Sequence, residues 1–374
     1  MAVGSRSVGD GRVTSDLRAW YKGRRVFVSG HTGFKGSWLA AWLLDAGAIV
    51  TGYSLPPAET PNLFDAADME QGMDSIFGDV RNQSALERAM RESAPEIVFH
   101  LAAQSLVRRS YREPVETYNT NIMGTVHLLD AARRIPALKA VVIVTSDKCY
   151  ENQGLDRGYV EEDPMGGHDP YSSSKGCVEL IASAYRRSFF LNSSVGVASA
   201  RAGNVIGGGD WGEDRLVPDI VRAAAANSPA VVRNPDSVRP WQFVLDPLRG
   251  YLMLARALTE HGQEYASAWN FGPRDAETVA VREIVQRVAG CWDRVTIKLP
   301  TSTDGPHEAR LLQLDCTKAR VKLGWEPLLD LDDTVKMTVD WYRAYYNDPM
   351  SAAALMHAQL DAYDTRAQQA GARQ

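Results

Sequence analysis

Short apolar runs alternate with helix-like stretches between Arg25 and Ala200. The runs have the length and the β-branched residues of strands, whereas the stretches between them repeat apolar residues with helical spacing. Such alternation is typical of a parallel sheet with helices on both faces. We therefore expect an α/β fold with a doubly wound parallel sheet. The expected strands are Arg25–Ser29, Ile49–Tyr53, Ser75–Phe77, Ile97–Leu101, Val141–Thr145 and Val195–Ala200, and the clearest helical stretches are Ser37–Ala46, Val115–Arg134 and Tyr171–Phe189.

The pattern loses its regularity after residue 203, where three consecutive glycines, Gly207–Gly209, open a proline-rich region. A chain of 374 residues is too long for one small domain and suits a large α/β domain with a smaller second lobe. We expect this lobe to bind a substrate, while one strand at 267–271 returns to the main sheet. The expected divisions are a loose tail at 1–20, the main domain with the catalytic residues at 21–203, the smaller C-terminal lobe at 204–350, and a C-terminal helix or tail at 351–374.

Composition argues against several classes of function. The chain has 41 basic and 46 acidic residues, a net charge of -5 and no dense Lys/Arg block, so nucleic acid is not an expected partner. No apolar run approaches the ~18 residues of a membrane span, and residues 1–20 lack the apolar stretch of a secretory signal. Four scattered cysteines without a Cys-x-x-Cys pair, and seven histidines without a His-x-x-x-His pair, indicate no metal site. Reduced thiols of this kind are typical of a cytoplasmic protein.

The segment Gly30–Gly36 joins the first expected strand to the first expected helix with the pattern G-x-x-G-x-x-G. Glycines permit a tight turn and a close approach of the backbone to a pyrophosphate, and the helix N-terminus behind them supplies free N–H groups. Because strand, loop and helix arrive in this order near the start of the fold, the segment indicates a Rossmann-type dinucleotide site more than an ordinary turn.

The end of the second expected strand does not decide between NAD and NADP. Residues 51–55 read TGYSL and contain neither a carboxylate for a ribose hydroxyl nor an arginine for a phosphate. Asp79, which follows the third expected strand, is a candidate contact for the adenine. The alternative for Asp79 is an ordinary aspartate in a turn.

Tyr171 and Lys175 stand four residues apart, a spacing that places both side chains on one face of a helix. Asp169 and Pro170 just before them are suited to the N-cap and first turn of that helix. A phenol is a poor base at neutral pH, and a nearby ammonium favours the phenolate. Thr145, at the end of the fifth expected strand, could hydrogen-bond a sugar oxygen that is being oxidised. Their position after this strand makes the trio a candidate catalytic set.

Together these motifs resemble the extended short-chain dehydrogenases that act on nucleotide-sugars. Within that group, longer stretches resemble the CDP-glucose 4,6-dehydratase family, and TSDKCYEN at 145–152 is the most specific of them. The likeness runs over about residues 20–345. The residues that carry it are Gly30–Gly36, Leu101–Gln104, Thr145–Ser146, Tyr171 with Lys175 and Arg201–Asn204 for the wider group, and Ser29–Trp38, Thr145–Asn152, Pro164–Glu179, Pro306–Ala309 and Leu314–Cys316 for the dehydratases.

The resemblance implies a hydro-lyase that uses NAD to convert CDP-glucose to CDP-4-keto-6-deoxyglucose. Tyr171 would take the proton of the C4 hydroxyl while hydride passes to NAD, water would leave across C5–C6, and hydride would return to C6. The resemblance further implies that Asp147 protonates the leaving hydroxyl and that Lys148 removes the C5 proton. The role of Lys148 demands a lowered pKa, as burial would produce. The alternative is an exposed Asp-Lys pair in the loop after the strand.

Resemblance and position together give the candidate site residues. Arginines in the second lobe suit a diphosphate because guanidinium forks match phosphate oxygens. The loop at 155–159 reads LDRGY and lacks both tryptophans of the W-x-W-G-Y pattern common in the family, which puts the fit of the substrate in doubt. The catalytic candidates are Thr145, Asp147, Lys148, Tyr171 and Lys175; those for NAD are Gly30, Thr32, Gly33, Phe34, Lys35, Gly36, Ser54, Asp79, Val80, Leu101, Ala102, Ala103, Gln104, Asn121, Tyr171, Lys175 and Arg201; those for the nucleotide-sugar are Asn204, Arg215, Arg239, Trp241, Arg249, His307 and Glu308.

Two other functions stay open. A nucleotide-sugar 4-epimerase would share Thr145, Tyr171 and Lys175 but needs no elimination pair, so Asp147 and Lys148 favour dehydration. A non-catalytic sensor that binds a dinucleotide would not need the intact catalytic trio.

The resemblance also implies an assembly. We expect a homodimer or a dimer of dimers that pairs through the helices at about 115–134 and 171–189. The residues expected at that contact are Leu128, Leu129, Val178 and Ile181.

Overall fold

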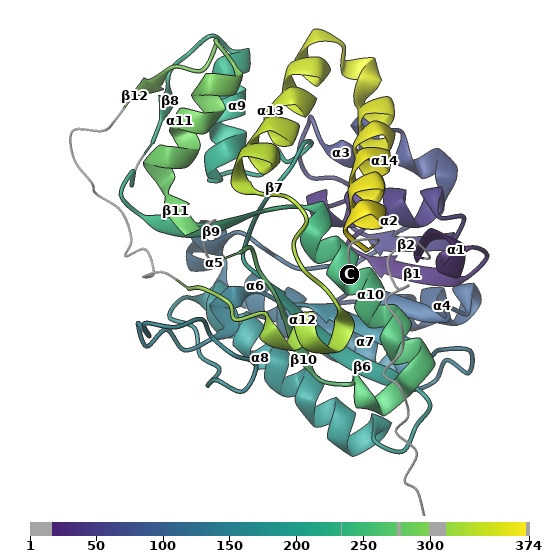
Figure 1. The fold of residues 1–374 in the computed structure, drawn as a ribbon. Coiled ribbons are helices and arrows are strands. Elements are labelled where there is room, and N and C mark those ends of the chain that lie inside the picture. The colour runs from purple at the N-terminus through teal and green to yellow at the C-terminus, as the bar shows by residue number, and fades with distance from the viewer. Residues whose placement is uncertain (1–16, 233, 275–277, 299–311, 372–374) are drawn as a thin grey trace, which may run out of the picture.

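A seven-stranded parallel sheet forms the centre of the molecule (Figure 1). The computed structural model describes residues 17–232, 234–274, 278–298 and 312–371 of the 374-residue chain. The strand order is β10-β6-β5-β4-β1-β2-β3, and growth of the sheet changes direction between β1 and β4. In sheets of this kind, ligands bind outside the carboxyl ends of the strands at that point. The strands are β1 (Arg25–Ser29), β2 (Ile49–Ser54), β3 (Asp74–Phe77), β4 (Ile97–His100), β5 (Ala140–Val144), β6 (Gly196–Ala202) and β10 (Ala268–Phe271).

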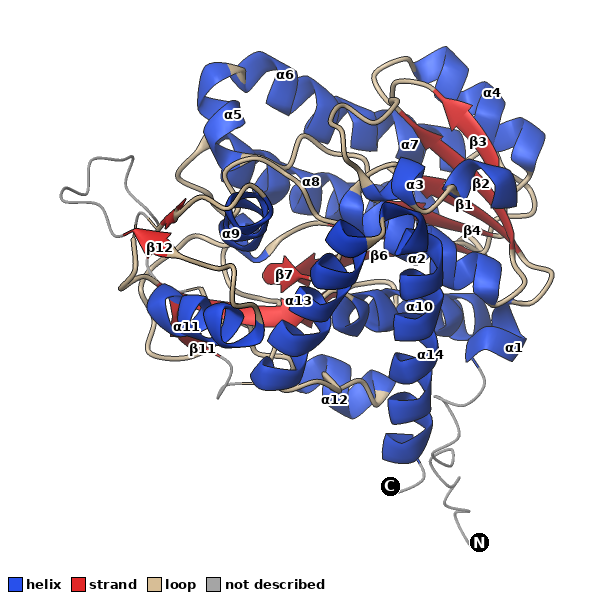
Figure 2. Cartoon of the chain, turned by 90° about the horizontal axis from the view of Figure 1, so that it is seen from above, coloured by secondary structure: helices blue, strands red, loops and turns tan. Residues whose placement is uncertain are grey.

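Helices cover both faces of the sheet, as the view in Figure 2 shows, and each face has its own apolar core. Trp38 and Trp42 of α2 belong to one core, which α10 and α14 also enter. Helices α4, α7 and α8 build the other core. The doubly wound Rossmann-type fold that the sequence predicts is therefore confirmed. The bounds of these helices are α2 (Phe34–Asp45), α10 (Leu245–His261), α14 (Ala352–Gly371), α4 (Gln83–Ser93), α7 (Gly124–Ala132) and α8 (Pro170–Tyr185).

The expected dimer contacts on α7 and α8 are core residues instead. Leu128 and Leu129 are fully buried and Val178 is nearly so, all three in the core under α4, α7 and α8. Ile181 is partly buried against the same core. The expectation was wrong because both helices turn these positions toward the sheet and not toward solvent.

A smaller lobe lies beyond the carboxyl ends of the strands. It contains the three-stranded sheet β11-β9-β7 and the two-stranded sheet β12-β8. Helix α11 packs on α13, and α13 also contacts β7 and β9. The elements are β7 (Asn204–Ile206), β8 (Ala230–Val231), β9 (Val238–Phe243), β11 (Thr278–Ala280), β12 (Ile297–Lys298), α9 (Leu216–Ala225), α11 (Val281–Cys291) and α13 (Leu331–Asn347), whereas α12 (Thr317–Leu323) packs on β10 and α10 of the main domain.

The chain after residue 203 serves both parts of the molecule. Strand β10 extends the main sheet beside β6, and α10 packs against β5 and β6. The C-terminal α14 lies on α2, where the Tyr363 ring meets the Trp42 ring at 5.5 Å. The Tyr363 hydroxyl also donates a hydrogen bond of 2.6 Å to Asp246 of α10. Residue 203 therefore marks a change in the sequence pattern, but segments after it belong to the main domain as well as to the smaller lobe.

Short helices and turns complete the main domain. Helices α5 and α6 and the π-helical turn η2 lie against α8. Within the described ranges, no helix has both the length and the apolar character needed to cross a bilayer. The remaining short elements are α1 (Leu17–Tyr21), α3 (Leu63–Ala66), η1 (Met69–Gly72), α5 (Val107–Arg112), α6 (Pro114–Tyr118), η2 (Asn119–Met123), η3 (Asp147–Cys149), η4 (Arg186–Phe190), η5 (Gly262–Glu264) and η7 (Pro349–Ser351).

Candidate active site

A cleft of about 1130 Å³ runs along the carboxyl ends of the strands. Its walls come from the main domain, including Gly30 and Tyr171, and from the smaller lobe, including Asn204 and Trp241. Pockets for a single small molecule usually occupy about 300–1,000 Å³. The cleft therefore has room for more than one ligand, or for one long ligand.

The glycine loop forms one end of the cleft, and two of its glycines leave no room for a side chain. Gly30 has φ +78°, and a Cβ there would lie 2.6 Å from the Ala102 backbone nitrogen. A Cβ on Gly36 would lie 2.0 Å from the Gly30 carbonyl oxygen. Gly33 is the N-cap of the twelve-residue α2 and offers no side-chain cap to its N–H groups. Free N–H groups at a helix N-terminus, approached through glycine, fit the pyrophosphate of a dinucleotide.

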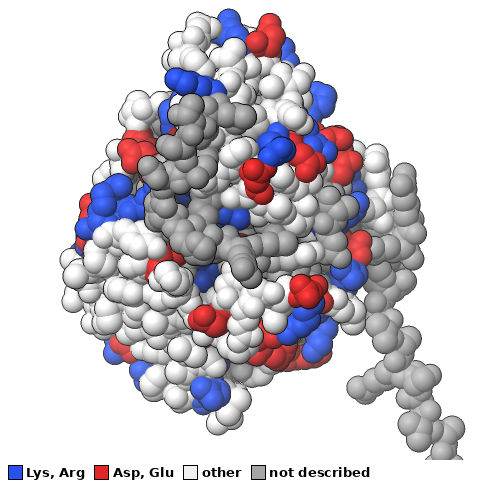
Figure 3. Space-filling model, turned by 90° about the vertical axis from the view of Figure 1, so that its left-hand side faces the viewer, with Lys and Arg blue, Asp and Glu red and all other residues white. Residues whose placement is uncertain are grey.

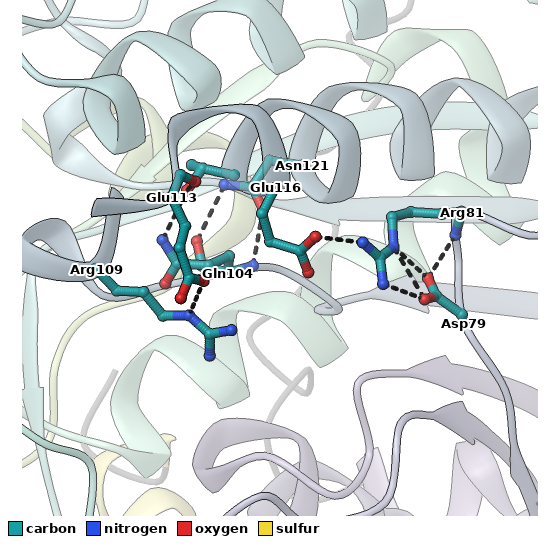
Figure 4. A network of polar contacts seen from close by, with 8 residues as sticks. Asp79, Arg81, Gln104, Arg109, Glu113, Glu116 and Asn121 are labelled. Carbon is teal, nitrogen blue, oxygen red and sulfur yellow. Dashed lines mark hydrogen bonds and ion pairs between the residues drawn. The ribbon is translucent and has the colours of Figure 1, made fainter. Parts of the chain in front are cut away.

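Asp79 lines the cleft after β3 and is held by Arg81. The Arg81 guanidinium donates to both carboxylate oxygens of Asp79, at 2.9 and 3.0 Å from its Nε, and also pairs with Glu116 of α6 (Figure 4). The hydrogen bonds from the Arg81 side chain hold the pKa of Asp79 below its usual value. A fixed carboxylate is suited to accept from the amino group of an adenine, and this role of Asp79 remains a prediction.

The other expected NAD contacts fall into two groups. Most of them line the cleft, and the others are buried behind its wall. Asn121 is buried behind that wall, where its amide exchanges two hydrogen bonds with the Gln104 backbone at 2.8 and 3.0 Å (Figure 4). It shapes the loop and does not touch the cleft, so its assignment as an NAD contact needs correction. Those that line the cleft are Gly30, Thr32, Gly33, Phe34, Lys35, Gly36, Ser54, Asp79, Val80, Leu101, Ala102, Ala103, Gln104, Tyr171 and Lys175.

Tyr171 meets the residues that follow β5 in the middle of the cleft. Ser146 favours the ionised form of its phenol, and the Ser146 hydroxyl donates to Asp147 Oδ1 at 2.8 Å. Lys148 Nζ donates to the same Asp147 oxygen at 3.3 Å. Hydroxyl, carboxylate and ammonium are thus linked by hydrogen bonds beside the Tyr171 phenol.

Lys148 is the cation that acts most strongly on Tyr171, although the sequence predicted that Lys175 would favour the Tyr171 phenolate. Burial raises the pKa of Tyr171, and Lys148 opposes the rise most strongly. Lys175 instead donates to the Val144 carbonyl at 3.2 Å, and burial lowers its pKa to about 8 against the attraction of Cys149 and Glu179. Lys35, in the glycine loop, also has a pKa lowered by burial, to about 7.

The pKa of Lys148 is raised, which is opposite to the expectation. Burial acts to lower it, but the negative charge of Asp147 and the nearby Tyr171 outweigh burial. The expectation considered burial alone and left out the carboxylate next in sequence, whose charge stabilises the ammonium.

Thr145 lines the cleft, and its expected contact with the sugar oxygen stays a prediction. The Thr145 hydroxyl donates to Glu179 of α8 at 2.5 Å, while Ser146 is the hydroxyl beside Tyr171. Successive side chains of an extended chain point to opposite sides, so only one of the two can face Tyr171. The sequence prediction missed Ser146. Its place next to Asp147, together with the alternation of side chains along the strand, is the signal that could have identified it.

The smaller lobe brings Asn204, Arg215, Arg239 and Trp241 to the cleft. Arg215 pairs with Asp210 at 2.8 Å and donates to the Ser105 hydroxyl at 3.1 Å, so it spans from the β7–α9 loop to the main domain. Two expected substrate residues, His307 and Glu308, lie outside the described residues.

Two expected ligand contacts are buried away from the cleft. Arg249 lies in α10 with 2% of its surface exposed and donates to the Glu326 carbonyl. Arg201 lies in β6 with 3% exposed and pairs with Glu179 at 2.9 Å. Both assignments were wrong because burial inside an element cannot be read from an arginine's place in sequence.

Gln153 and Gly154, just before the loop that lacks the two tryptophans, line the cleft. The Gln153 N–H donates to the Tyr159 hydroxyl at 2.8 Å, and Arg157 pairs with Asp163. These contacts fix the loop without the tryptophans. Among the described residues, no group of three or more His, Cys, Asp or Glu side chains is arranged to hold a metal ion.

Comparison with known proteins adds to this geometry. The family model for GDP-mannose 4,6 dehydratase matches residues 27–338. CDP-glucose 4,6-dehydratase of Salmonella typhimurium is 50% identical over 331 residues, which cover 87% of this chain and 92% of that protein. Among solved structures, UDP-glucose 4-epimerase of Thermus thermophilus in complex with NAD is 25% identical with a TM-score of 0.73, covering 85% of this chain and 99% of that one. dTDP-glucose 4,6-dehydratase of Bacillus anthracis in complex with NAD, 23% identical with a TM-score of 0.72, covers 87% and 97% and shares the fold.

Proposed function

The chain belongs to the GDP-mannose 4,6 dehydratase family, and from this premise we propose that it is an NAD-dependent hydro-lyase that dehydrates CDP-glucose to CDP-4-keto-6-deoxyglucose. The single observation that carries the proposal is the set of Tyr171, Ser146, Asp147 and Lys148 in the cleft. It combines a base for oxidation with a carboxyl–amine pair for elimination. Identity of 50% to a CDP-glucose 4,6-dehydratase supports both the reaction and the nucleotide.

The glycine cradle and the cleft residues from Thr32 to Gln104 fit NAD. When bound, NAD accepts a hydride from C4 and later returns it to C6. Tyr171 accepts the proton of the C4 hydroxyl, and Ser146 orients the oxygen by a hydrogen bond. Burial makes the free phenolate costly, so the Lys148 ammonium stabilises the phenolate form in which Tyr171 can accept that proton.

Elimination uses the Asp147–Lys148 pair. The C4 ketone makes the C5 proton acidic, and a neutral Lys148 removes it while Asp147 donates a proton to the C6 hydroxyl, which leaves as water. The pair must therefore first move one proton from Lys148 Nζ to Asp147 Oδ1, across the 3.3 Å contact. After elimination, Lys148 carries a proton and Asp147 is again a carboxylate. When hydride returns to C6, Lys148 gives its proton back to C5, and the proton that Tyr171 took from the C4 hydroxyl passes to Lys148, so the cycle closes without an outside proton donor.

The smaller lobe supplies cations for the diphosphate of the substrate. Arg215 and Arg239 both line the cleft there, and guanidinium groups match phosphate oxygens. Asn204 and Trp241 complete the candidate contacts with the nucleotide-sugar.

We also propose a homodimer, or a dimer of dimers, that pairs through the outer faces of α6, η2 and α8. Large apolar side chains are exposed there, among them Val115 at 71% and Leu180 at 61%. An exposed apolar surface of this kind marks an interaction site. Acidic and basic side chains are interspersed on the face seen in Figure 3.

A direct test incubates the purified protein with CDP-, dTDP-, GDP- and UDP-glucose and analyses each product by mass spectrometry. We expect CDP-glucose to lose one water. An isobaric product would indicate a 4-epimerase, and no product from any of the four would indicate a sensor; either result would overturn the proposal.

A further inference from the structure

Glu179 is a buried carboxylate that the proposed chemistry does not use. It lies in α8 one turn beyond Lys175, which itself lies one turn beyond Tyr171, so the three side chains share one face of the helix. Only 3% of Glu179 is exposed. A buried charge is costly unless it is paired and hydrogen-bonded, which calls for a reason why a carboxylate stands here.

Three donors from two strands satisfy the Glu179 carboxylate. Thr145, directly after β5, donates at 2.5 Å, and Ser199 and Arg201 of β6 donate at 2.7 and 2.9 Å. Burial raises the pKa of Glu179, but Arg201 and the hydrogen bonds outweigh it, so the group stays ionised.

Arg201 extends the network to the far end of the catalytic segment. Its Nη1 donates to the Tyr150 hydroxyl at 2.5 Å, and its guanidinium lies 4.7 Å from the centre of the Tyr150 ring. Tyr150 in turn donates to Asn270 of β10 at 2.8 Å. The segment 145–150 is therefore tied at its first residue to Glu179 and at its last to Arg201. The proposed catalytic residues Ser146, Asp147 and Lys148 lie between these two ties.

Glu179 also acts on the charge of Lys175. The groups that face Lys175 are Cys149 of η3, Glu179 of α8, His100 of β4 and Lys35 of α2. Burial lowers the pKa of Lys175 to about 8, and Cys149 and Glu179 oppose that fall. Burial holds the Cys149 thiol protonated by raising its pKa, which leaves Glu179 as the standing negative charge of this pair.

We infer that Glu179 is a positioning residue of the active site, which with Arg201 clamps both ends of segment 145–150. The inference rests on the proposed dehydration, because it assigns the residues between the ties to that reaction. It also accounts for the hydrogen bond from Thr145 to Glu179.

The test compares Glu179→Gln with Asp246→Asn. Asp246 is an equally buried carboxylate that accepts from Tyr363 at 2.6 Å and from the Leu328 N–H at 2.8 Å, outside the residues that line the cleft. Both variants should lower Tm. The pH profile of kcat for CDP-glucose should separate them: loss of activity at alkaline pH should begin about one pH unit lower in Glu179→Gln and at the parent pH in Asp246→Asn. A merely structural role of Glu179 would leave its alkaline limb at the parent pH and would overturn the inference.

Thr145→Val provides a second test that leaves the Glu179–Arg201 pair in place, should Glu179→Gln fail to fold. Loss of one tie should lower kcat about 10-fold and leave KM for CDP-glucose unchanged. A parent-like kcat, or a large rise in KM with kcat unchanged, would overturn the clamp. If the parent protein itself does not dehydrate CDP-glucose, the proposed function fails first, and the two failures remain distinct.

Discussion

Lys148 Nζ lies 3.3 Å from Asp147 Oδ1, and the pair is arranged as ammonium and carboxylate. Burial acts to lower the pKa of Lys148, but Asp147 and Tyr171 raise it above its usual value. Elimination needs the opposite distribution of the proton, with a neutral amine and a carboxylic acid. A nucleotide-sugar that covers the cleft would favour this change, because exclusion of water disfavours two separated charges.

Lys148→Ala should separate oxidation from elimination. Tyr171, Ser146 and Lys175 stay in place, so hydride should still reach the cofactor from C4, although more slowly, because the ammonium that favours the Tyr171 phenolate is gone. The C5 proton then lacks its base, and the protein should accumulate reduced cofactor and a 4-keto sugar that retains its C6 hydroxyl. Single-turnover absorbance of the nicotinamide with CDP-glucose measures the reduced cofactor, and deuterium uptake at C5 measures whether the C5 proton is removed. Normal dehydration with parent uptake of deuterium would reduce Lys148 to a surface residue.

Tyr171→Phe should remove nearly all turnover and change binding of the nucleotide-sugar only a few-fold. The ring still packs, but the acceptor for the C4 proton is gone, and loss of a general base typically costs about 10²–10⁴ in rate. Steady-state kinetics and calorimetric titration measure the two effects. Turnover near the parent rate would require another base in the cleft.

The parts of the site that depend on local pattern could be predicted from the sequence. A glycine loop between a strand and a helix, and the Tyr171–Lys175 spacing on one helix face, need only neighbours along the chain. The strands of the main sheet follow for the same reason, since buried parallel strands are continuous apolar runs.

The parts that depend on tertiary contacts could not. Whether Thr145 or Ser146 faces Tyr171 is set by the register of β5 against β6 and α8, which the sequence does not contain. Arg201 and Arg249 have the composition of ligand contacts, but their elements bury them. The raised pKa of Lys148 likewise depends on the fold of the turn η3, which brings its ammonium back onto Asp147.

Gly36→Ala should abolish binding of NAD. The added Cβ would lie 2.0 Å from the Gly30 carbonyl oxygen, so the loop must open and its N–H groups must leave the position suited to a pyrophosphate. Gly290→Ala in α11 is the matched control, because a Cβ there meets nothing within 4 Å and alanine favours a helix. Fluorescence titration with NAD should show no saturable binding for Gly36→Ala and parent affinity for Gly290→Ala. Parent affinity in both would mean that the cradle does not hold the dinucleotide.

His100 should make the fold sensitive to acid. It is buried between Ser29 and Thr125, and burial, with Lys175, lowers its pKa to about 3. An unfolded histidine binds a proton near pH 6.5, so below that pH the unfolded state binds more protons and stability falls as pH falls toward 3. Between pH 7 and pH 5 this group alone should cost about 2 kcal/mol of unfolding free energy.

Urea unfolding at pH 7 and pH 5 measures the loss, and His100→Gln is the comparison because glutamine does not titrate. The variant is expected to be less stable than the parent at pH 7, with a smaller further loss at pH 5. An equal loss in both proteins would show that the stability lost between pH 7 and pH 5 does not come from His100.

Val115→Asp should weaken the assembly. Val115 lies on α6 with 71% of its surface exposed. Tyr118 of the same helix is also exposed, as are Met123 of η2 and Leu180 of α8, which pack beside α6. A carboxylate placed in an apolar interface would lose its water without gaining a partner, which is costly. Val321→Asp on α12 is the matched control, since Val321 is 75% exposed on an element outside the proposed interface. Sedimentation velocity at micromolar concentration should find the parent and Val321→Asp as dimers or larger, and Val115→Asp shifted toward monomer. A parent that sediments as a monomer, or a Val115→Asp variant that assembles as the parent does, would move the interface away from these helices.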